Sequence, residues 1–590
     1  MVDISKRSLL GAPLLAALAM PALAQAQAQA QAQAPDTDVT YDLPTTPGPF
    51  APTEESLRTY QAPDWFRDAK FGIWAHWGPQ AVPRQGDWYA RFMYVPGHPH
   101  YDHHLKTYGH PSKVGYKDII PLWTAEKWDP EALMDLYVAA GARYFVSMGC
   151  HHDNFELWNS KKHRWNATKM GPMRDVVGEW QRAAKKRGLK FGVSEHMGAS
   201  YGWFAPSHGY DQFWPLLGVD YDGADPQYAD LYHPKHDEPY RGGDTWYAKN
   251  PQWHQEWFDR VSDLTGSYTP DLLYTDGALP FREVGRTLLA NLYNASIATH
   301  GSQQAVYTSK MFAAGDWDTQ GGTRDVERGV MKGINPLPWQ TDTSIGDWFY
   351  SEGYTYKTTD EVVHMLADIV AKNGNLLLNV VLYPDGSLPP ESQTFLGEMA
   401  AWMKVNGEAI HGTRLWHTYG EGPTETAEGA FKEDTAYTPQ DIRFTTKAGV
   451  LYAITLGVPQ GQVTAASLGR KAGRVKHVEL LGAGPVAFRQ TATALTMDVP
   501  ATLPTKHGST FKITMPDARR RPVAEPPSVA SVLKQKMVCL FPFLPRSRGR
   551  CRRVATTEGG ADNWVPPFRH SLRSRHLPLE RGRKSHPDRA

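Results

Sequence analysis

The stretch "TTDEVVHMLADIVAKNGNLLLNV", residues 358–380, contains the pattern of one helix followed by one strand. Thr358 and Glu361 have the spacing of a capping box, which marks the start of a helix. Apolar residues then recur at helical intervals, and Gly374 is expected to end the helix. The apolar run Leu376–Val380 follows as a buried strand. The stretch therefore predicts a helix-then-strand unit of an α/β protein.

The same unit recurs along the chain. Asp129 and Asn250 each precede a proline, a combination typical of a helix start. Gly141 and Gly188 are expected to end two helices. The predicted apolar helix faces are Leu133, Leu136, Tyr137 and Ala140; Val176, Val177, Trp180 and Ala184; and Trp257, Val261 and Leu264. Together with Leu376–Val380, the strand candidates are residues 70–76, 143–149, 189–194, 271–276 and 304–309.

Alternating helices and strands over residues 53–409 predict a parallel sheet. A (β/α)₈-type barrel suits this length better than an open doubly wound sheet, which remains the alternative. The sequence contains no glycine-rich phosphate loop of the Rossmann or Walker type. Beyond residue 410, alternating apolar residues flank Lys447-Ala448-Gly449 and predict a β-hairpin. Residues 410–516 are therefore expected to form a small C-terminal antiparallel β-sandwich.

The N-terminus has the features of a secretory signal peptide, residues 1–24. Lys6 and Arg7 precede a short apolar run, and Ala22-Leu23-Ala24 offers a small-x-small cleavage site. A Gln-Ala repeat and a Pro-rich stretch follow, so residues 25–52 are expected to form a low-complexity linker. The sequence thus predicts export to the periplasm or the extracellular space. The apolar run is too short for a good membrane span.

Charge is distributed unevenly along the 590 residues. Residues 519–590 contain 17 Lys and Arg against 5 Asp and Glu, a charge of +12, so the first 518 residues carry −11 within the total of +1. The predicted folded body is acidic and gives no electrostatic reason to expect nucleic-acid binding. Residues 517–590 show no periodicity and are expected to be a basic, disordered tail. The chain has three cysteines, two of them in this tail, so Cys150 has no partner in the predicted body and no disulfide framework is expected.

Polar side chains follow the predicted strands. In a barrel of this kind, chemistry gathers at the carboxyl ends of the strands. The residues at these positions are His76, His151, His152, His196, Asp276 and Lys310. Zinc would explain the histidines, although adjacent residues of an extended chain point to opposite sides. Imidazoles that bind sugar hydroxyls, beside Trp77, Phe155 and Trp203, are the other interpretation.

Eight stretches carry a family resemblance. They are WFRDAKFGIWAHWGPQAVP (65–83), WYARFMY (88–94), PLWTAEKWDPEAL (121–133), HHDNFELWNSKKHRWN (151–166), RDVVGEW (174–180), DLLYTDG (271–277), NGNLLLNV (373–380) and VNGEAIHGT (405–413). In sequence and order they resemble the α-L-fucosidases of glycoside hydrolase family 29. The resemblance implies a barrel, a C-terminal β-sandwich, and retaining hydrolysis through a covalent fucosyl-enzyme. It implies no metal and no cofactor.

The resemblance also assigns roles to individual residues. Asp276 matches the nucleophile of the family. The residues that match sugar ligands are His76, His151 and His152, with His196 where members have Tyr or His, and Trp88. Four positions depart from the family: Asp87 replaces a Glu, Tyr274 replaces a Trp, Lys310 stands near a usual Arg, and Ile345 replaces an aromatic residue beside the sugar's methyl group.

The general acid/base of the family precedes a Trp-Glu-like stretch, which is Trp339-Gln340 in this chain. The resemblance thus points to Glu327, with Glu283, Asp325 and Glu352 as rivals, and Trp339 is expected at the substrate. The implied substrate is a fucosylated oligosaccharide or glycoconjugate. An enzyme of the same fold that acts on α-L-galactosides and an inactive fucose-binding protein are the alternatives.

Overall fold

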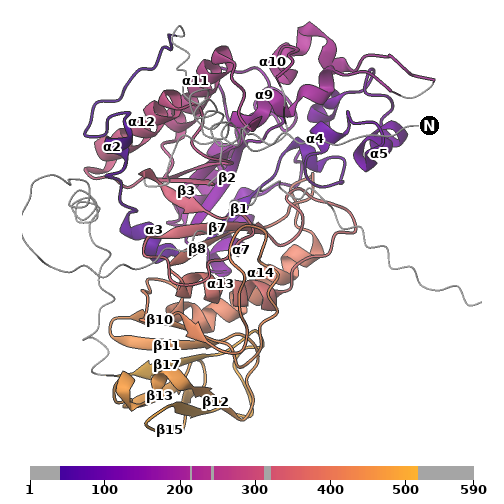
Figure 1. Cartoon of the computed structure of the whole chain (residues 1–590). Helices are drawn as coiled ribbons and strands as arrows, with labels where there is room; N and C mark the ends of the chain where they lie inside the picture. Colours follow the sequence, from indigo (N-terminus) through magenta and orange to yellow (C-terminus); the bar gives the residue numbers. More distant parts are fainter. Residues whose placement is uncertain (1–39, 213–214, 239, 241–244, 311–320, 516–590) are drawn as a thin grey trace, which may run out of the picture. The chain divides into compact units, whose positions relative to one another are not determined.

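The computed structural model of the protein describes residues 40–212, 215–238, 240, 245–310 and 321–515 (Figure 1). The predicted signal peptide, residues 1–24, and the predicted basic tail, residues 517–590, lie outside this part of the chain and stay predictions.

Eight parallel strands close into a barrel, in which each strand pairs with the next along the chain and β1 pairs with β8. The closed barrel confirms the predicted fold class and excludes an open sheet. The strands are β1 (Phe71–Ala75), β2 (Tyr144–Cys150), β3 (Lys190–Glu195), β4 (Leu272–Thr275), β5 (Val306–Lys310), β6 (Thr323–Asp325), β7 (Trp339–Ser344) and β8 (Gly374–Asn379).

The sequence pattern missed β6 and β7 because their residues are short of apolar side chains. β7 reads Trp-Gln-Thr-Asp-Thr-Ser, yet all six residues are buried. Burial is tolerated because the polar groups are hydrogen-bonded inside the protein. Gln340 donates to Asp325 Oδ1 at 3.0 Å, and Thr341 Oγ1 donates to the Gly329 carbonyl at 2.8 Å. A polar strand of this kind has no apolar periodicity to reveal it.

The long helices cover the barrel (Figure 1). They are α7 (Pro130–Ala139), α8 (Val176–Lys186), α11 (Pro251–Tyr268), α12 (Glu283–His300), α13 (Thr359–Ala371) and α14 (Pro390–Asn406). Shorter ones are α2 (Glu54–Leu57), α3 (Asp64–Ala69), α4 (Tyr89–Phe92), α5 (Pro99–Thr107), α6 (Tyr116–Ile119), α9 (Ser200–Trp203) and α10 (Ala229–Tyr232). Within the described ranges, no helix is both long and apolar enough to cross a membrane.

The helix predicted within residues 358–380 is α13. Its predicted capping box is present between Thr358 and Glu361. The prediction that Gly374 ends this helix was wrong. The helix ends at Ala371, Asn373 has a positive φ of 75°, and Gly374 begins β8. Glycine is needed there for space, because a Cβ atom would lie 2.6 Å from the Trp339 ring.

Two further expectations are corrected by the structure. Leu136 of α7 is 43% exposed, and Met134 takes the buried position instead. Residues 40–52, predicted as part of a linker, are bonded to the barrel helices. The Tyr41 hydroxyl lies 2.8 Å from His254 Nδ1 of α11, and the Phe50 amide donates to Asn294 Oδ1 of α12.

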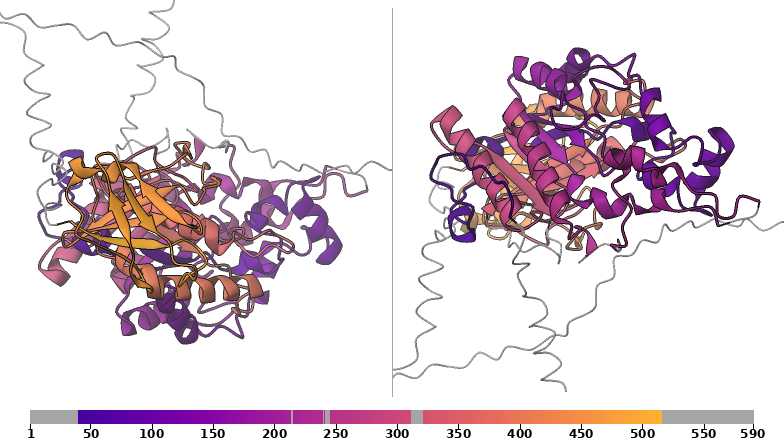
Figure 2. Two further views of the ribbon diagram at one scale, coloured as in Figure 1. Left: turned by 90° about the horizontal axis from the view of Figure 1, so that it is seen from below. Right: turned by 90° about the horizontal axis from the view of Figure 1, so that it is seen from above.

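The C-terminal residues form two antiparallel sheets, in the orders β14-β13-β17-β11-β10-β9 and β12-β16-β15. Seen from below, these orange to yellow strands group together (Figure 2, left). The predicted hairpin is β10 and β11, with positive φ at Ala448 and Gly449 in its turn. The strands are β9 (Gly420–Glu421), β10 (Ile442–Lys447), β11 (Val450–Thr455), β12 (Gln462–Ala465), β13 (His477–Leu480), β14 (Gly484–Pro485), β15 (Phe488–Gln490), β16 (Leu495–Asp498) and β17 (Thr510–Thr514).

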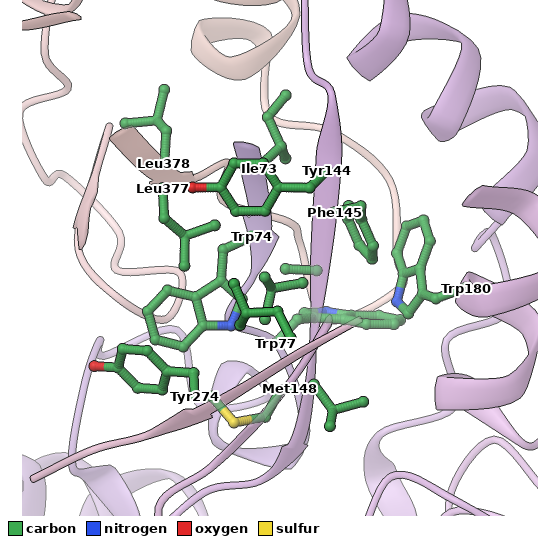
Figure 3. Packing of buried hydrophobic residues seen from close by; sticks show 14 of the residues in the cluster. Ile73, Trp74, Trp77, Tyr144, Phe145, Met148, Trp180, Tyr274, Leu377 and Leu378 are labelled. Carbon is green, nitrogen blue, oxygen red and sulfur yellow. The ribbon is translucent and has the colours of Figure 1, made fainter. Parts of the chain in front are cut away.

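The barrel core contains large aromatic side chains. Phe145 of β2 and Trp180 of α8 pack with their ring centroids 4.7 Å apart, which attaches this helix to the sheet (Figure 3). Trp74 of β1 lies against Tyr274 of β4 at 5.0 Å (Figure 3). Its ring also lies 4.9 Å from that of His76, at the end of the same strand. Trp74 thus connects the core with the strand ends.

A buried carboxylate joins α13 to the C-terminal sheet. Asp368 accepts from Lys372 Nζ at 2.7 Å and from Arg443 Nε of β10 at 2.6 Å. All three side chains are at least 98% buried. Both cations therefore depend on one anion for charge balance.

Asp368→Asn should destabilise the protein strongly, because it leaves two buried cations without their carboxylate. Losing one partner of a buried ion pair typically costs about 3–5 kcal/mol. Thr358→Ala in the capping box of the same helix is the control, with an expected cost of about 1 kcal/mol. Urea unfolding followed by circular dichroism measures both. Equal midpoints for the two variants would contradict the assignment.

Candidate active site

The side chains that follow the first five barrel strands meet at one end of the barrel. Ring centroids are 5.0 Å apart for His76 and His151, 4.5 Å for His151 and His152, and 5.3 Å for His152 and His196. Asp276 lies 3.2 Å from His152 Nε2 through Oδ2. Parallel strands explain the convergence, because all their carboxyl ends lie on the same face of the barrel.

Side-chain nitrogens of Lys310, His152 and His196 surround the Asp276 carboxylate. Its Oδ1 atom lies 2.6 Å from Lys310 Nζ, and its Oδ2 atom lies 3.4 Å from His196 Nδ1. Trp246 Nε1 donates to its backbone carbonyl at 3.2 Å. Burial opposes ionisation, but Lys310, His196 and His152 outweigh it and hold the pKa of Asp276 well below its usual value. The carboxylate is therefore ionised and rigidly held.

Glu327 lies on the other side of the same ammonium group. Its Oε2 atom is 2.7 Å from Lys310 Nζ. Because the two bonds to Nζ measure 2.6 and 2.7 Å, the bound oxygens of Asp276 and Glu327 are at most 5.3 Å apart. Burial raises the pKa of Glu327 to about 7; Asp342 and Asp276 add to the rise, and Lys310 opposes it. The pair thus combines an ionised and a readily protonated carboxyl group.

The rivals of Glu327 are not in this arrangement. Glu283 is exposed at the start of α12, and Glu352 is exposed in the loop after β7. Asp325 is buried within β6 and accepts from Gln340 at 3.0 Å. Of the four candidates, only Glu327 forms a hydrogen bond to the ammonium group that holds Asp276.

The hydrogen bonds of Gln80 determine the tautomer of His151. The Ala90 amide donates to Gln80 Oε1 at 3.2 Å, so the side-chain amide nitrogen faces His151 Nδ1 and donates to it at 2.8 Å. With Nδ1 accepting, the neutral ring carries its proton on Nε2. This N–H lies 3.7 Å from Asp87 Oδ1. His151 therefore offers a donor, and no lone pair, on its Nε2 side.

His152 has acceptors on both sides of its ring. Nδ1 donates to the His196 carbonyl at 2.7 Å, and Nε2 faces Asp276 Oδ2. His152 is thus placed to orient Asp276.

Two groups of side chains come close enough for metal binding: His76, His151 and His196, and His152, His196 and Asp276, each with ligand atoms within 4.8 Å of one another. A metal needs a lone pair from each imidazole. His151 Nδ1 already accepts from Gln80, so its Nε2 carries the proton and has no lone pair for a metal. The hydrogen bonding of the group that contains His151 therefore fits oxygen-bearing ligands better than a metal.

Some buried nitrogens near Asp276 have no hydrogen-bond partner within the described chain. These are His76 Nδ1, His196 Nε2 and Trp203 Nε1. Burial lowers the pKa of His76 to about 3 and holds that of His196 well below its usual value, so burial favours the neutral form of both rings. An unsatisfied buried polar group costs about 1–3 kcal/mol. A ligand rich in hydroxyl groups would satisfy several of these atoms at once.

Aromatic rings surround the histidines. Trp88, with a positive φ of 61°, lies 5.8 Å from the His152 ring and 5.8 Å from Trp203. Phe349 and Trp348 lie 4.7 and 5.3 Å from His76. Sequence reasoning missed Phe349 and Trp348 because they follow β7, the strand without an apolar pattern. It also missed Gln80 and Trp246, which no local signal distinguishes.

The structure corrects the expectation for Trp339. This residue begins β7, is fully buried, and donates to the Lys372 carbonyl at 3.0 Å. It pairs with Gly374 at the start of β8, so it lies at the opposite ends of the strands from Asp276 and cannot contact the same ligand.

Two other predicted residues are buried beneath the site. Tyr274 is fully buried in β4, and its hydroxyl donates to Asp342 at 2.9 Å and lies 3.4 Å from Asp276 Oδ1. Ile345 is also fully buried. The aromatic contact to the histidines, which Ile345 cannot supply, comes from Phe349.

Comparison with known proteins agrees with this architecture. Residues 39–408 match the family Alpha-L-fucosidase. The plasma alpha-L-fucosidase of Homo sapiens is 30% identical over 387 residues, which are 64% of this chain and 74% of the relative. The tissue alpha-L-fucosidase of Homo sapiens is 27% identical over 428 residues, which are 71% of this chain and 80% of the relative.

A similar solved structure is that of Thermotoga maritima alpha-fucosidase in complex with fucose. It is 28% identical and has a TM-score of 0.59. The match covers 79% of this chain and 100% of the Thermotoga maritima chain. The barrel and its carboxylate pair define a glycoside hydrolase. More narrowly, the chain belongs to the α-L-fucosidase family, glycoside hydrolase family 29.

Chelation should leave the protein unchanged, because the His151 ring presents an N–H where a metal would need a lone pair. Dialysis against EDTA is expected to change neither the melting temperature nor glycoside hydrolysis, and elemental analysis should find less than one zinc per chain. Stoichiometric zinc, with loss of activity on its removal, would restore the metal interpretation.

Proposed function

We propose that this protein is a retaining exo-α-L-fucosidase that releases terminal α-L-fucosyl residues from fucosylated oligosaccharides or glycoconjugates. The observation that carries the proposal is the carboxylate pair on Lys310, with bound oxygens at most 5.3 Å apart. Retaining glycosidases have carboxyl groups about 5–5.5 Å apart, and inverting enzymes need about 6.5–9.5 Å. Family membership supports the choice of sugar.

In the first step, the Asp276 carboxylate attacks the anomeric carbon while Glu327 protonates the departing glycosidic oxygen. The bond from the anomeric carbon to that oxygen breaks, and a glycosyl ester forms on Asp276. The contacts of the two residues suit these roles. Lys310, His152 and His196 favour the ionised form of Asp276, and burial favours the protonated form of Glu327.

In the second step, Glu327 accepts a proton from water, and the water oxygen displaces Asp276 from the sugar. Formation of the ester removes the negative charge of Asp276, which contributes to the raised pKa of Glu327. Lys310 Nζ then has one fewer anion to balance, so its attraction favours ionised Glu327. The same residue can therefore act first as the acid and then as the base.

The sugar hydroxyls would be bound by the histidines. His151 offers its Nε2–H, and the unpartnered nitrogens His76 Nδ1 and His196 Nε2 lie in the same group of rings. The aromatic rings of Trp88 and Phe349 lie against His152 and His76 and suit the apolar side of a bound sugar. The signal peptide predicted at residues 1–24 leads us to propose that the enzyme acts after export, in the periplasm or outside the cell.

The pH dependence should reflect Glu327. Its pKa is raised to about 7, so the proton needed for the first step is present below that pH and is lost above it. We expect kcat/KM for a fucosyl disaccharide to fall above about pH 7. Asp276 stays ionised far into the acid range, so it should add no limb near pH 4. A basic limb centred near pH 4.5 would contradict this assignment.

Asp276→Gly should abolish hydrolysis, because no group remains to form the glycosyl ester. Added azide can occupy the vacated space and attack the anomeric carbon of an activated α-L-fucoside directly. One displacement inverts the configuration, so the product should be β-fucosyl azide, identified by NMR. An α product from this variant would overturn the nucleophile assignment.

Glu327→Ala should behave differently. The first step survives for p-nitrophenyl α-L-fucoside, whose leaving group needs little protonation, while the second step loses its base. The intermediate should accumulate with a burst of nitrophenol. Azide then attacks the intermediate, and two displacements should yield α-fucosyl azide. Unchanged steady-state rates for this variant would show that another residue is the acid/base.

A further inference from the structure

A segment of the C-terminal region, residues 429–433, pairs with the loop that carries Glu327. Val330 and Gly429 form an isolated antiparallel bridge. The backbone bonds are Phe431 N–H to the Glu327 carbonyl at 3.0 Å, Lys432 N–H to the Arg328 carbonyl at 3.0 Å, Gly429 N–H to the Val330 carbonyl at 3.0 Å, and Val330 N–H to the Gly429 carbonyl at 3.3 Å. The segment thus adds an edge to the loop after β6.

Glu433 ends this segment, and its side chain is only 5% exposed. Its carboxylate accepts from Thr343 Oγ1 of β7 at 2.6 Å and from Lys357 Nζ at 2.9 Å. Arg328 Nη1, from the residue after Glu327, lies 3.5 Å away. One buried carboxylate therefore links the Glu327 loop, the end of β7 and the loop that leads to α13.

The cations bound by Glu433 also contact a ring beside His76 and the end of β7. The Arg328 guanidinium lies over the Trp348 ring at 5.1 Å, and that ring lies 5.3 Å from His76. Lys357 Nζ donates to the Ser344 carbonyl at 3.1 Å, at the end of β7. Movement of Glu433 would therefore be transmitted to the backbone beside Glu327 and to the ring beside His76.

We propose that Glu433 is a positioning residue for the general acid/base, so that the C-terminal region supplies part of the active-site framework. Glu433 forms hydrogen bonds and ion pairs to protein groups, and it acts through Arg328, Thr343 and the 429–433 segment. The inference rests on the proposed function, in which Glu327 donates a proton to the leaving group. Proton donation depends steeply on geometry, because a shift of about 1 Å can cost about 100-fold in rate.

The test compares leaving groups. Glu433→Gln keeps an acceptor for Thr343 and removes the charge that binds Lys357 and Arg328. For a fucosyl disaccharide, whose leaving group must be protonated, kcat/KM should fall about tenfold or more. The leaving group of 2-chloro-4-nitrophenyl α-L-fucoside departs without protonation. For this substrate, kcat/KM of the variant should stay within about twofold of the unaltered enzyme. The Glu433→Asp variant, which keeps the charge, should show the same preference in weaker form.

Glu398→Gln is the matched control. Glu398 of α14 also accepts from a threonine, Thr359, at 2.7 Å and from a lysine, Lys506, at 2.5 Å, and it likewise joins a barrel helix to the C-terminal region. Within the part of the chain that the structure describes, Glu398 forms no hydrogen bond to the Glu327 loop, so Glu398→Gln should lower kcat/KM for both substrates equally or not at all. Melting temperatures of all variants report any loss of stability.

The outcomes separate the two proposals. Equal losses on both substrates in Glu433→Gln and Glu433→Asp, or no loss on either, would overturn the positioning role. The same leaving-group preference in Glu398→Gln would also overturn it, because the effect would then follow from general loosening. If the unaltered enzyme hydrolyses neither fucoside, the proposed function itself fails.

Discussion

The ion pairs of Lys310 are the constraint on which the site depends. One ammonium group bonds to Asp276 at 2.6 Å and to Glu327 at 2.7 Å. Two carboxylates this close repel each other when both are ionised. With Asp276 ionised and Glu327 protonated, the three groups together are neutral. Lys310 holds the two carboxyl groups close together, whereas burial, with Asp342 and Asp276, favours the protonated form of Glu327. Catalysis of the proposed kind needs both.

Carboxylates in the reverse arrangement, one anion between two cations, connect the barrel to the C-terminal region. Asp368 binds Lys372 and Arg443 beside α13. Glu433 binds Arg328 and Lys357 beside the Glu327 loop. All of these groups are largely buried, so removing either anion would leave two buried cations without their charge partner. The first contact attaches a helix to a sheet, whereas the second reaches the active-site loop.

Much of the barrel could be predicted from sequence because its signals are local. Capping residues and apolar periodicity revealed α13, α8 and six of the eight strands. β6 and β7 could not be recognised in this way. Their polar side chains are satisfied by residues that only the closed barrel brings near, as when Gln340 donates to Asp325. Apolar periodicity in the sequence indicates which residues avoid water. It cannot indicate a buried polar group whose hydrogen-bond partner is distant in the sequence.

The sequence by itself determined the helix-and-strand alternation and the positions of the histidines and Asp276 at strand ends. Motif resemblance pointed to Glu327 as the proposed acid/base. Only the tertiary structure decided which groups touch. It removed Trp339 from the site, placed Phe349 against His76, and brought Glu433 to the Glu327 loop. The physical reason is range: helix and strand patterns arise between near neighbours, whereas hydrogen bonds and pKa values depend on atoms brought together from distant parts of the chain.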